Sequence, residues 1–205
     1  MATTAAPYGL KPVKRADGQP YAGATSEYLI DPAGEATNIF FGQVVHLGTD
    51  GYIALSTATG ADGTTNALPT GTTLKGSLGV FVGCEYKNAE GQQIFSQYYP
   101  SGTANGGAIK ALIVDDPNVL FQAQLDGAAA QADVGQNTFF AAAQSTSTGS
   151  TSTGNSTSAL EADSVATTAA FRIVSFVSPA TDAYPDVLVK FNPGYHSMTS
   201  AVAVA

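Results

Sequence analysis

Residues 39–56 read IFFGQVVHLGTDGYIALS, and this stretch carries the clearest structural signal in the chain. Apolar side chains alternate along its first half, one face holding Ile39, Phe41, Val45 and Leu47 around Gln43, the other holding Phe40, Val44 and His46. A period of two is typical of a β-strand. Asp50–Gly51 precedes a second apolar run, and this dipeptide favours a two-residue turn because glycine accepts a positive φ. The stretch therefore predicts that Ile39–Gly48 and Tyr52–Ser56 pair as an antiparallel hairpin.

Similar runs extend along the rest of the chain. They begin at about Glu27 and continue as Leu78–Tyr86, Gln93–Tyr99, Ala108–Val114, Val119–Leu125, Thr138–Ala143, Thr168–Val177 and Val187–Phe191. In the Leu78–Tyr86 run, Gly79 and Gly83 share the second face, which indicates a bulge or a close backbone approach. Gly127–Asp133 is the only Ala-rich segment and predicts one helical turn. We expect an all-β fold, an antiparallel β-sandwich or β-barrel, and leave open a division into two β-lobes.

Three segments flank or interrupt this β-domain, which is expected to span residues 27–196. Residues 1–26 are rich in Pro and Gly as far as Gly23, which predicts an extended arm lying along a surface, without a core of its own. Thr57–Lys75 is expected to be a long loop. Gln144–Ser158, QSTSTGSTSTGNSTS, has no large apolar side chain and is expected to be a loop or a disordered tongue. Residues 197–205 form a small, neutral tail that is expected to fray or to add an edge strand to a neighbour.

The 205-residue chain is acidic and sparsely charged. It has 16 acidic and 8 basic residues, a net charge of -8, and only 12% charged residues, about half the usual share of roughly a quarter. Its largest basic cluster is Lys11, Lys14 and Arg15, which is too small for binding a phosphate backbone, so we expect no nucleic-acid partner. No apolar run approaches the roughly 20 residues that span a bilayer, and no signal peptide is evident, so we expect no membrane and assembly in a cytoplasm.

Few residues are suited to catalysis. His46 and His196 are the only histidines, each in a plain context, and Cys84 is the only cysteine, which excludes a disulfide within the chain. Cys84 lies in a predicted strand without a cationic neighbour, so a buried thiol is expected rather than a thiolate. Phosphate-loop, dinucleotide, zinc-protease and C-x-x-C motifs are missing from the sequence. We therefore expect a protein that is not an enzyme and has no cofactor.

Two further clusters have a structural and a functional interpretation. Asp115–Asp116 before Pro117 could bind a hard cation through oxygen ligands, but an Asp before Pro more often begins a turn. Tyr98 and Tyr99, with Phe95 nearby, could form a platform for a sugar, but their alternation is explained more simply by core and interface positions. We therefore expect turn residues in the first cluster and packing residues in the second.

An ordered set of segments resembles a family of small virion proteins from tailed phages. The segments are PYGLKPVKRADGQPYAGAT, FFGQVVHLGTDGYI, GVFVGCEYKNAEGQQIFSQYYP, DDPNVLFQAQLDG, SVATTAAFRIVSFV and FNPGYHS. The resemblance implies a decoration (cement) protein on the capsid exterior, where it would bridge major capsid subunits as a homo-oligomer, with a trimer favoured. It carries over no catalytic residues.

On this interpretation the arm contacts the capsid through partner-binding residues Tyr8, Leu10, Lys11, Lys14 and Arg15. The alternative function is a host-surface or carbohydrate-binding module of a tail or fibre protein, suggested by Tyr98, Tyr99 and the Gln144–Ser158 loop. A major capsid protein fits less well, because the chain is short and has no long helix. A small hydrolase that depends on His46 or His196 fits least well.

Overall fold

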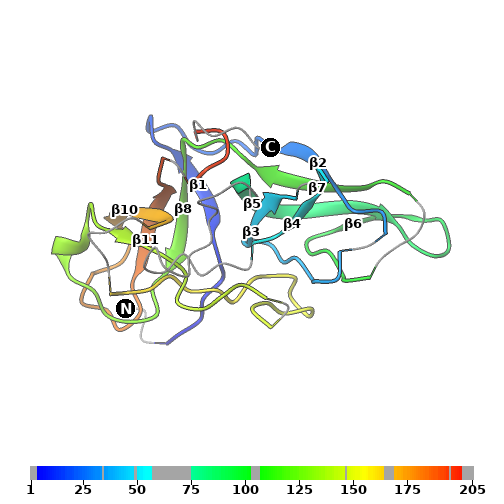
Figure 1. Cartoon of the computed structure of the whole chain (residues 1–205). Helices are drawn as coiled ribbons and strands as arrows, with labels where there is room; N and C mark the ends of the chain where they lie inside the picture. Colours follow the sequence, from blue (N-terminus) through cyan, green and yellow to red (C-terminus); the bar gives the residue numbers. More distant parts are fainter. Residues whose placement is uncertain are drawn as a thin grey trace.

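The computed structural model is an all-β protein in which two sheets pack together as a β-sandwich, as the sequence predicted (Figure 1). It describes residues 4–33, 35–48, 50–56, 75–102, 107–145, 147–163, 169–193 and 195–199. Within these ranges the first sheet has the order β1 (Lys11–Arg15), β8 (Val119–Gln124), β11 (Asp186–Phe191), β10 (Phe171–Phe176) and β9 (Asn137–Thr138). The second has the order β3 (Val44–Leu47), β4 (Ile53–Leu55), β2 (Ser26–Ile30), β7 (Ile109–Val114), β5 (Lys75–Lys87) and β6 (Gln93–Ser96). Most of the predicted loop (57–74) and of the predicted tail (200–205) lies outside the described residues.

The second sheet closes on itself. β3 pairs with β4 and also with β5, while β4 meets β2 through the parallel pair Ile30–Ile53. Together with the β2–β7 and β5–β7 pairings, these contacts form a ring of five strands, with β6 attached to the far end of β5. The ring encloses a set of buried side chains that we call the barrel cluster: Ile30, Ile39, Val45, Ile53, Leu55, Leu78, Phe81, Cys84, Tyr99, Ile109, Ala111 and Ile113.

A second set of buried side chains, the inter-sheet cluster, fills the space between the two sheets. The ring contributes Val44, Val80 and Val114 to it, and the first sheet contributes aromatic residues such as Phe121 and Phe191, whose rings meet edge to face at 5.7 Å. Val44 and Val45 are neighbours in sequence but face different clusters, and the same holds for Val80 and Phe81 and for Ile113 and Val114. Both faces of the ring are therefore buried where it meets the first sheet.

β5 departs from simple alternation near two of its three glycines, Gly79 and Gly83. Its pairing with β3 shifts register around Leu78, and its pairing with β7 shifts around Val82. A Cβ on Gly79 would collide with the carbonyl oxygen of Val114, so the β7 backbone approaches closely there. The predicted bulge and close approach are confirmed. The simple alternation of Leu78–Tyr86, which would put Leu78, Val80 and Cys84 on one face, is wrong, because each shift turns the following residues to the other side.

The N-terminal segment is built into the fold. β1 pairs with β8 in antiparallel register, and Leu10 is fully buried in the inter-sheet cluster. The chain passes close to the segment before β3, since a Cβ on Gly9 would lie 2.6 Å from the oxygen of Gly42. The expectation that the arm lies along a surface without a core is therefore wrong for this part of it.

The Gln144–Ser158 stretch is a loop without a named strand among its described residues, and it runs beneath both sheets in the view of Figure 1. It is nevertheless closely packed. The side-chain oxygen of buried Gln144 accepts the Val44 N–H at 2.9 Å, and its Nε2 donates to the carbonyl oxygens of Val44 and Ser56 at 3.2 and 2.7 Å. Ser156 donates its N–H to the Phe41 carbonyl at 2.9 Å. The polar side chain of Gln144 can be buried because it completes the backbone hydrogen bonding of Val44 at the start of β3.

Several smaller expectations can be compared with the structure. The predicted hairpin is confirmed, with Val45 opposite Leu55, but the predicted strand Ile39–Gly48 is wrong before Val44, where β3 begins. The Ala-rich segment contains a single 3-10 turn at Gln131–Asp133. The predicted strand Thr138–Ala143 is wrong beyond Thr138, because the chain bends so that Phe140 enters the inter-sheet cluster. In the described ranges no helix has the length and apolar character needed to cross a membrane.

The Gln144→Leu substitution tests the role of this amide side chain. It keeps a similar volume but leaves the buried Val44 N–H without its acceptor, and an unpaired buried group costs about 1–3 kcal/mol. We expect urea denaturation to show a loss of about 2 kcal/mol in the free energy of unfolding. The control Gln131→Leu, on an exposed residue, should change it by about 0.5 kcal/mol or less. Equal stability of the two variants would contradict the role of Gln144.

The Gly79→Ala substitution tests the close approach of β5 and β7. The added methyl group collides with backbone, which cannot rotate away as a side chain can, so we expect a loss of about 1–3 kcal/mol in the free energy of unfolding. Gly107→Ala is the matched control, because a Cβ there meets no atom within 4 Å. Both variants can be compared by thermal unfolding, and an unchanged midpoint for Gly79→Ala would show that the strands are not in this contact.

Candidate binding site

Cys84 is used for packing. It lies in the barrel cluster, where burial raises the pKa of its thiol to about 12, so the reactive thiolate does not form at neutral pH. Its Sγ lies 3.5 Å from the carbonyl oxygen of Tyr98, to which it donates. The expectation of an inert, buried thiol is confirmed.

The two histidines flank one buried serine. His46 on β3 pairs with Ser77 on β5, and His196 bridges to the same Ser77 from the C-terminal segment. Burial lowers the pKa of both imidazoles. In the described structure no hydrogen bond joins the Ser77 hydroxyl to either ring, and Ser77 is 1% exposed. His196 instead accepts the Met198 N–H on Nδ1 at 3.2 Å, within its own segment. The backbone of Ser77 donates to the Tyr195 carbonyl and accepts from the Ser197 N–H, both at 2.9 Å, and these bonds anchor the C-terminal segment to β5.

The Asp115–Asp116 pair connects strands. Asp115 accepts hydrogen bonds from the hydroxyls of Ser26 and Tyr28 at 3.0 and 2.8 Å. Asp116 accepts from the guanidinium of Arg15 and from the N–H of Asn118, which closes the turn between β7 and β8. The turn interpretation is confirmed. Among the described residues no group of three His, Cys, Asp or Glu side chains is arranged to hold a metal ion.

The aromatic platform considered for sugars does not form. Tyr99 is fully buried in the barrel cluster. Tyr98 stacks on Phe40, with ring centroids 5.5 Å apart and an angle of 19° between the rings. Phe95, in contrast, is 74% exposed on β6. The three side chains therefore have separate roles, and the packing interpretation holds for the two tyrosines.

The five predicted partner-binding residues are placed differently from one another. Leu10 is fully buried, so its assignment as a contact residue is wrong. Arg15 is held by ion pairs with Asp17 and Asp116. Lys14 is half-buried on β1, whereas Lys11 is exposed. Tyr8 is half-buried and donates its hydroxyl proton to Asp186 at 2.9 Å.

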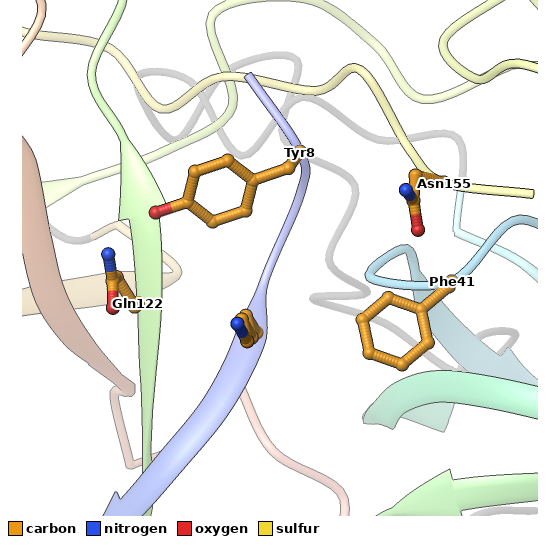
Figure 2. Close-up of a pocket in the computed structure, with 5 residues that line it drawn as sticks. Tyr8, Phe41, Gln122 and Asn155 are labelled. Atoms are coloured by element: carbon orange, nitrogen blue, oxygen red, sulfur yellow. The ribbon is translucent and has the colours of Figure 1, made fainter. Parts of the chain in front are cut away.

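Tyr8 and Lys11 line a hollow of about 320 Å³ together with Phe41, Gln122 and Asn155 (Figure 2). These residues come from β1 and the segment before it, from β8, from the segment before β3, and from the Gln144–Ser158 loop. Figure 2 shows Tyr8 and Gln122 on one side and Phe41 and Asn155 on the other, with the blue β1 ribbon between them. The hollow therefore lies where both sheets and the loop meet.

The lining of the hollow is held in place by hydrogen bonds to residues behind it. Gln122 donates Nε2 to Asp186 at 3.2 Å, and Asn155 accepts from the Gln97 amide on Oδ1. Burial and the nearby Asp186 carboxylate raise the pKa of Tyr8, so its phenol stays protonated and keeps its bond to Asp186. Among the five described lining residues, Lys11 is the cationic one. A cation beside aromatic rings and amides suits a carboxylate or another oxygen-rich group.

The sequence indicated only part of this site. Lys11 and Tyr8 were selected from the basic arm, but Phe41, Gln122 and Asn155 were missed. They lie far apart in the sequence, and long-range backbone contacts bring them together: the β1–β8 pairing, the Phe41–Asn155 bridge and the hydrogen bond from the Leu10 N–H to the Gly42 carbonyl. Comparisons with known protein families, with curated proteins and with solved structures gave no significant match.

The histidine pKa values predict how stability depends on pH. A histidine whose pKa is lowered by folding binds its proton more tightly in the unfolded chain, so stability is complete above about pH 6.5 and falls as the pH drops below it. We expect the free energy of unfolding to decrease between pH 7 and pH 5. His196→Gln should reduce that decrease, because it removes one of the two groups, although Asp115 and Asp116 oppose the shift. Denaturant titrations at both pH values measure it, and an identical decrease in the variant would exclude His196.

Proposed function

We propose that this protein is a structural virion protein that binds the outer surface of a phage head and stabilises the capsid lattice by bridging major capsid subunits. The observation that carries the proposal is the hollow around Lys11, which has a rigid lining and is open to a partner. On a chain with a net charge of -8, it offers a local cation to an acidic side chain of a neighbouring subunit. The segments that resemble small phage virion proteins support the same role.

The way in which functional groups are used also supports binding rather than catalysis. The thiol of Cys84 and the imidazole of His196 are both buried, and the described hydrogen bonds use them to hold the fold. Asp115 and Asp116 likewise hold strands and turns. The groups that are exposed, Lys11 at the hollow and Phe95 on β6, are suited to contact with a partner. Such groups contribute to recognition and are not arranged as nucleophile and base.

Binding to a lattice would work by avidity. A capsid presents many equivalent sites, and an oligomer that engages several of them binds far more tightly than one contact allows. β1 is already paired within the chain, so β1 and the segment before it contribute the side chains of Lys11 and Tyr8 rather than a free strand. A subunit bound across two capsid proteins would oppose the outward pressure of packaged DNA.

The Lys11→Glu substitution tests this proposal. Lys11 is exposed and forms no ion pair among the described residues, so the fold should be retained, while an acidic partner would now be repelled. We expect the copy number of the variant in purified virions, measured by quantitative mass spectrometry, to fall about tenfold or more. Lys190→Glu makes the same charge change on the same sheet and should leave the copy number unchanged. Absence of the unmodified protein from mature heads would contradict the proposal itself.

A carbohydrate-binding module of a tail or fibre is the second candidate, and one observation favours it. Phe41 and Tyr8 lie beside the amides of Gln122 and Asn155, and aromatic rings with amides are suited to sugar faces and hydroxyls. Gold labelling of virions distinguishes the two functions. Label over the head supports the capsid role, and label at tail tips, together with binding to immobilised glycans, supports the second.

A further inference from the structure

β6 has an open edge. In the described part of the chain it pairs with β5 alone, and its outer side makes no backbone hydrogen bond. The end strands of the first sheet are covered. Outside β1, Tyr21 donates to the Val13 carbonyl at 3.1 Å, and beyond β9, Glu161 donates to the Phe139 carbonyl at 2.8 Å. Open edges are templates for strand pairing, and proteins usually protect them with charges, prolines or bulges.

The hydrogen-bonding pattern of the β5–β6 hairpin determines which groups face outward. The Asn88 N–H donates to the Gln92 carbonyl at 3.0 Å, and the register continues without a shift to Cys84–Ser96. Hydrogen-bonded and non-hydrogen-bonded pairs alternate in an antiparallel ladder. The N–H and C=O groups of Gln93 and Phe95 therefore point away from β5, ready to pair with another strand.

This edge also lacks the usual protection. Residues 91–101, GQQIFSQYYPS, contain no charged side chain, although the whole chain carries a net charge of -8. Phe95 projects from the edge and is 74% exposed, the largest exposed fraction among the large hydrophobic residues described. Two copies of an acidic chain repel each other wherever their acidic surfaces meet, but the neutral edge of β6 imposes no such repulsion.

We propose that two copies of this chain associate by antiparallel pairing of β6 with β6 across a two-fold axis, with Phe95 of each copy opposite Gln93 of the other. An antiparallel edge is complementary to itself, because the outward N–H and C=O groups of Gln93 and Phe95 match those of the second copy. The contact continues the second sheet from one copy into the next.

Charge selects this register. On β5, Glu85 lies opposite Phe95 and Lys87 lies opposite Gln93. Placing Phe95 opposite Gln93 of the second copy gives the row Glu85, Phe95, Gln93, Lys87, with opposite charges on the two sides of the neutral pair. Two other symmetric registers place like charges on both sides: Phe95 against Phe95 leaves Glu85 on both sides, and Gln93 against Gln93 leaves Lys87 on both sides. The inferred contact is two-fold, unlike the three-fold association that the family resemblance implies, and it does not depend on what the hollow around Lys11 binds.

The mass of the full chain in solution tests the contact. Light scattering after size exclusion should show a two-chain species. Phe95→Lys should raise the dissociation constant of this species about 30-fold or more, as expected for a central aromatic residue. Val177→Lys is the matched control, because Val177 is also exposed (51%) and lies just after β10, away from β6. This substitution should leave the two-chain species unchanged. A single-chain or three-chain species, or a two-chain species insensitive to Phe95→Lys, would overturn the proposal.

A cysteine substitution tests the register. In the proposed pairing Ile94 faces Ile94 of the second copy as a non-hydrogen-bonded pair, whose Cα atoms lie about 4.5 Å apart, within the range of a disulfide. Mild oxidation of Ile94→Cys should give a covalent two-chain band on a non-reducing gel, whereas Val177→Cys should not. Buried Cys84 should not contribute, because its thiol is protonated. Absence of the band, or equal bands for both variants, would reject this register.

Discussion

The whole structure depends on strands whose neighbouring residues face two different cores. In β3, Val44 points to the inter-sheet cluster and Val45 to the barrel cluster, and Val80 and Phe81 divide in the same way on β5. A slip of one residue in either strand would exchange the two sets of side chains, so the register is fixed from both sides. The bulges of β5 follow from this constraint, because one strand has to serve β3, β7 and β6 in different registers.

Burial on both faces creates a second requirement, which is met by side-chain amides. Where β3 begins, the backbone is buried but has left the regular ladder, and each unpaired group there would cost free energy. Gln144 supplies both an acceptor and a donor to Val44, and Gln43 accepts the Phe40 N–H at 2.8 Å while its Nε2 donates to Thr148 at 3.0 Å. The polar loop is therefore part of the packing, and its lack of large apolar side chains is compatible with a buried position.

Local patterns in the sequence were sufficient for the fold class and for the β3–β4 hairpin, because a turn dipeptide and a period of two act over a few residues. The pairing of strands that lie far apart in the sequence could not be predicted from such local patterns. Lys11 pairs with Gln122 across more than half of the chain, so no local pattern indicated that Leu10 would be buried behind β1. Three of the five residues that line the hollow were missed for the same reason. Gln144 was missed because hydrogen bonds between a side chain and a distant backbone leave no periodic signal.

The chemistry of the two exposed features suggests that they bind different partners. The hollow combines the cation of Lys11 with two side-chain amides on an otherwise acidic protein. It is therefore suited to an acidic or oxygen-rich group of a partner. The β6 edge is neutral and offers backbone groups, which recognise another strand regardless of its side-chain charge. Among the described residues β6 pairs with β5 alone, whereas the hollow lies where both sheets and the loop meet. No residue of β6 is among the five that line the hollow, so a partner bound at one feature leaves the groups of the other available, as the proposed bridging of several subunits would require.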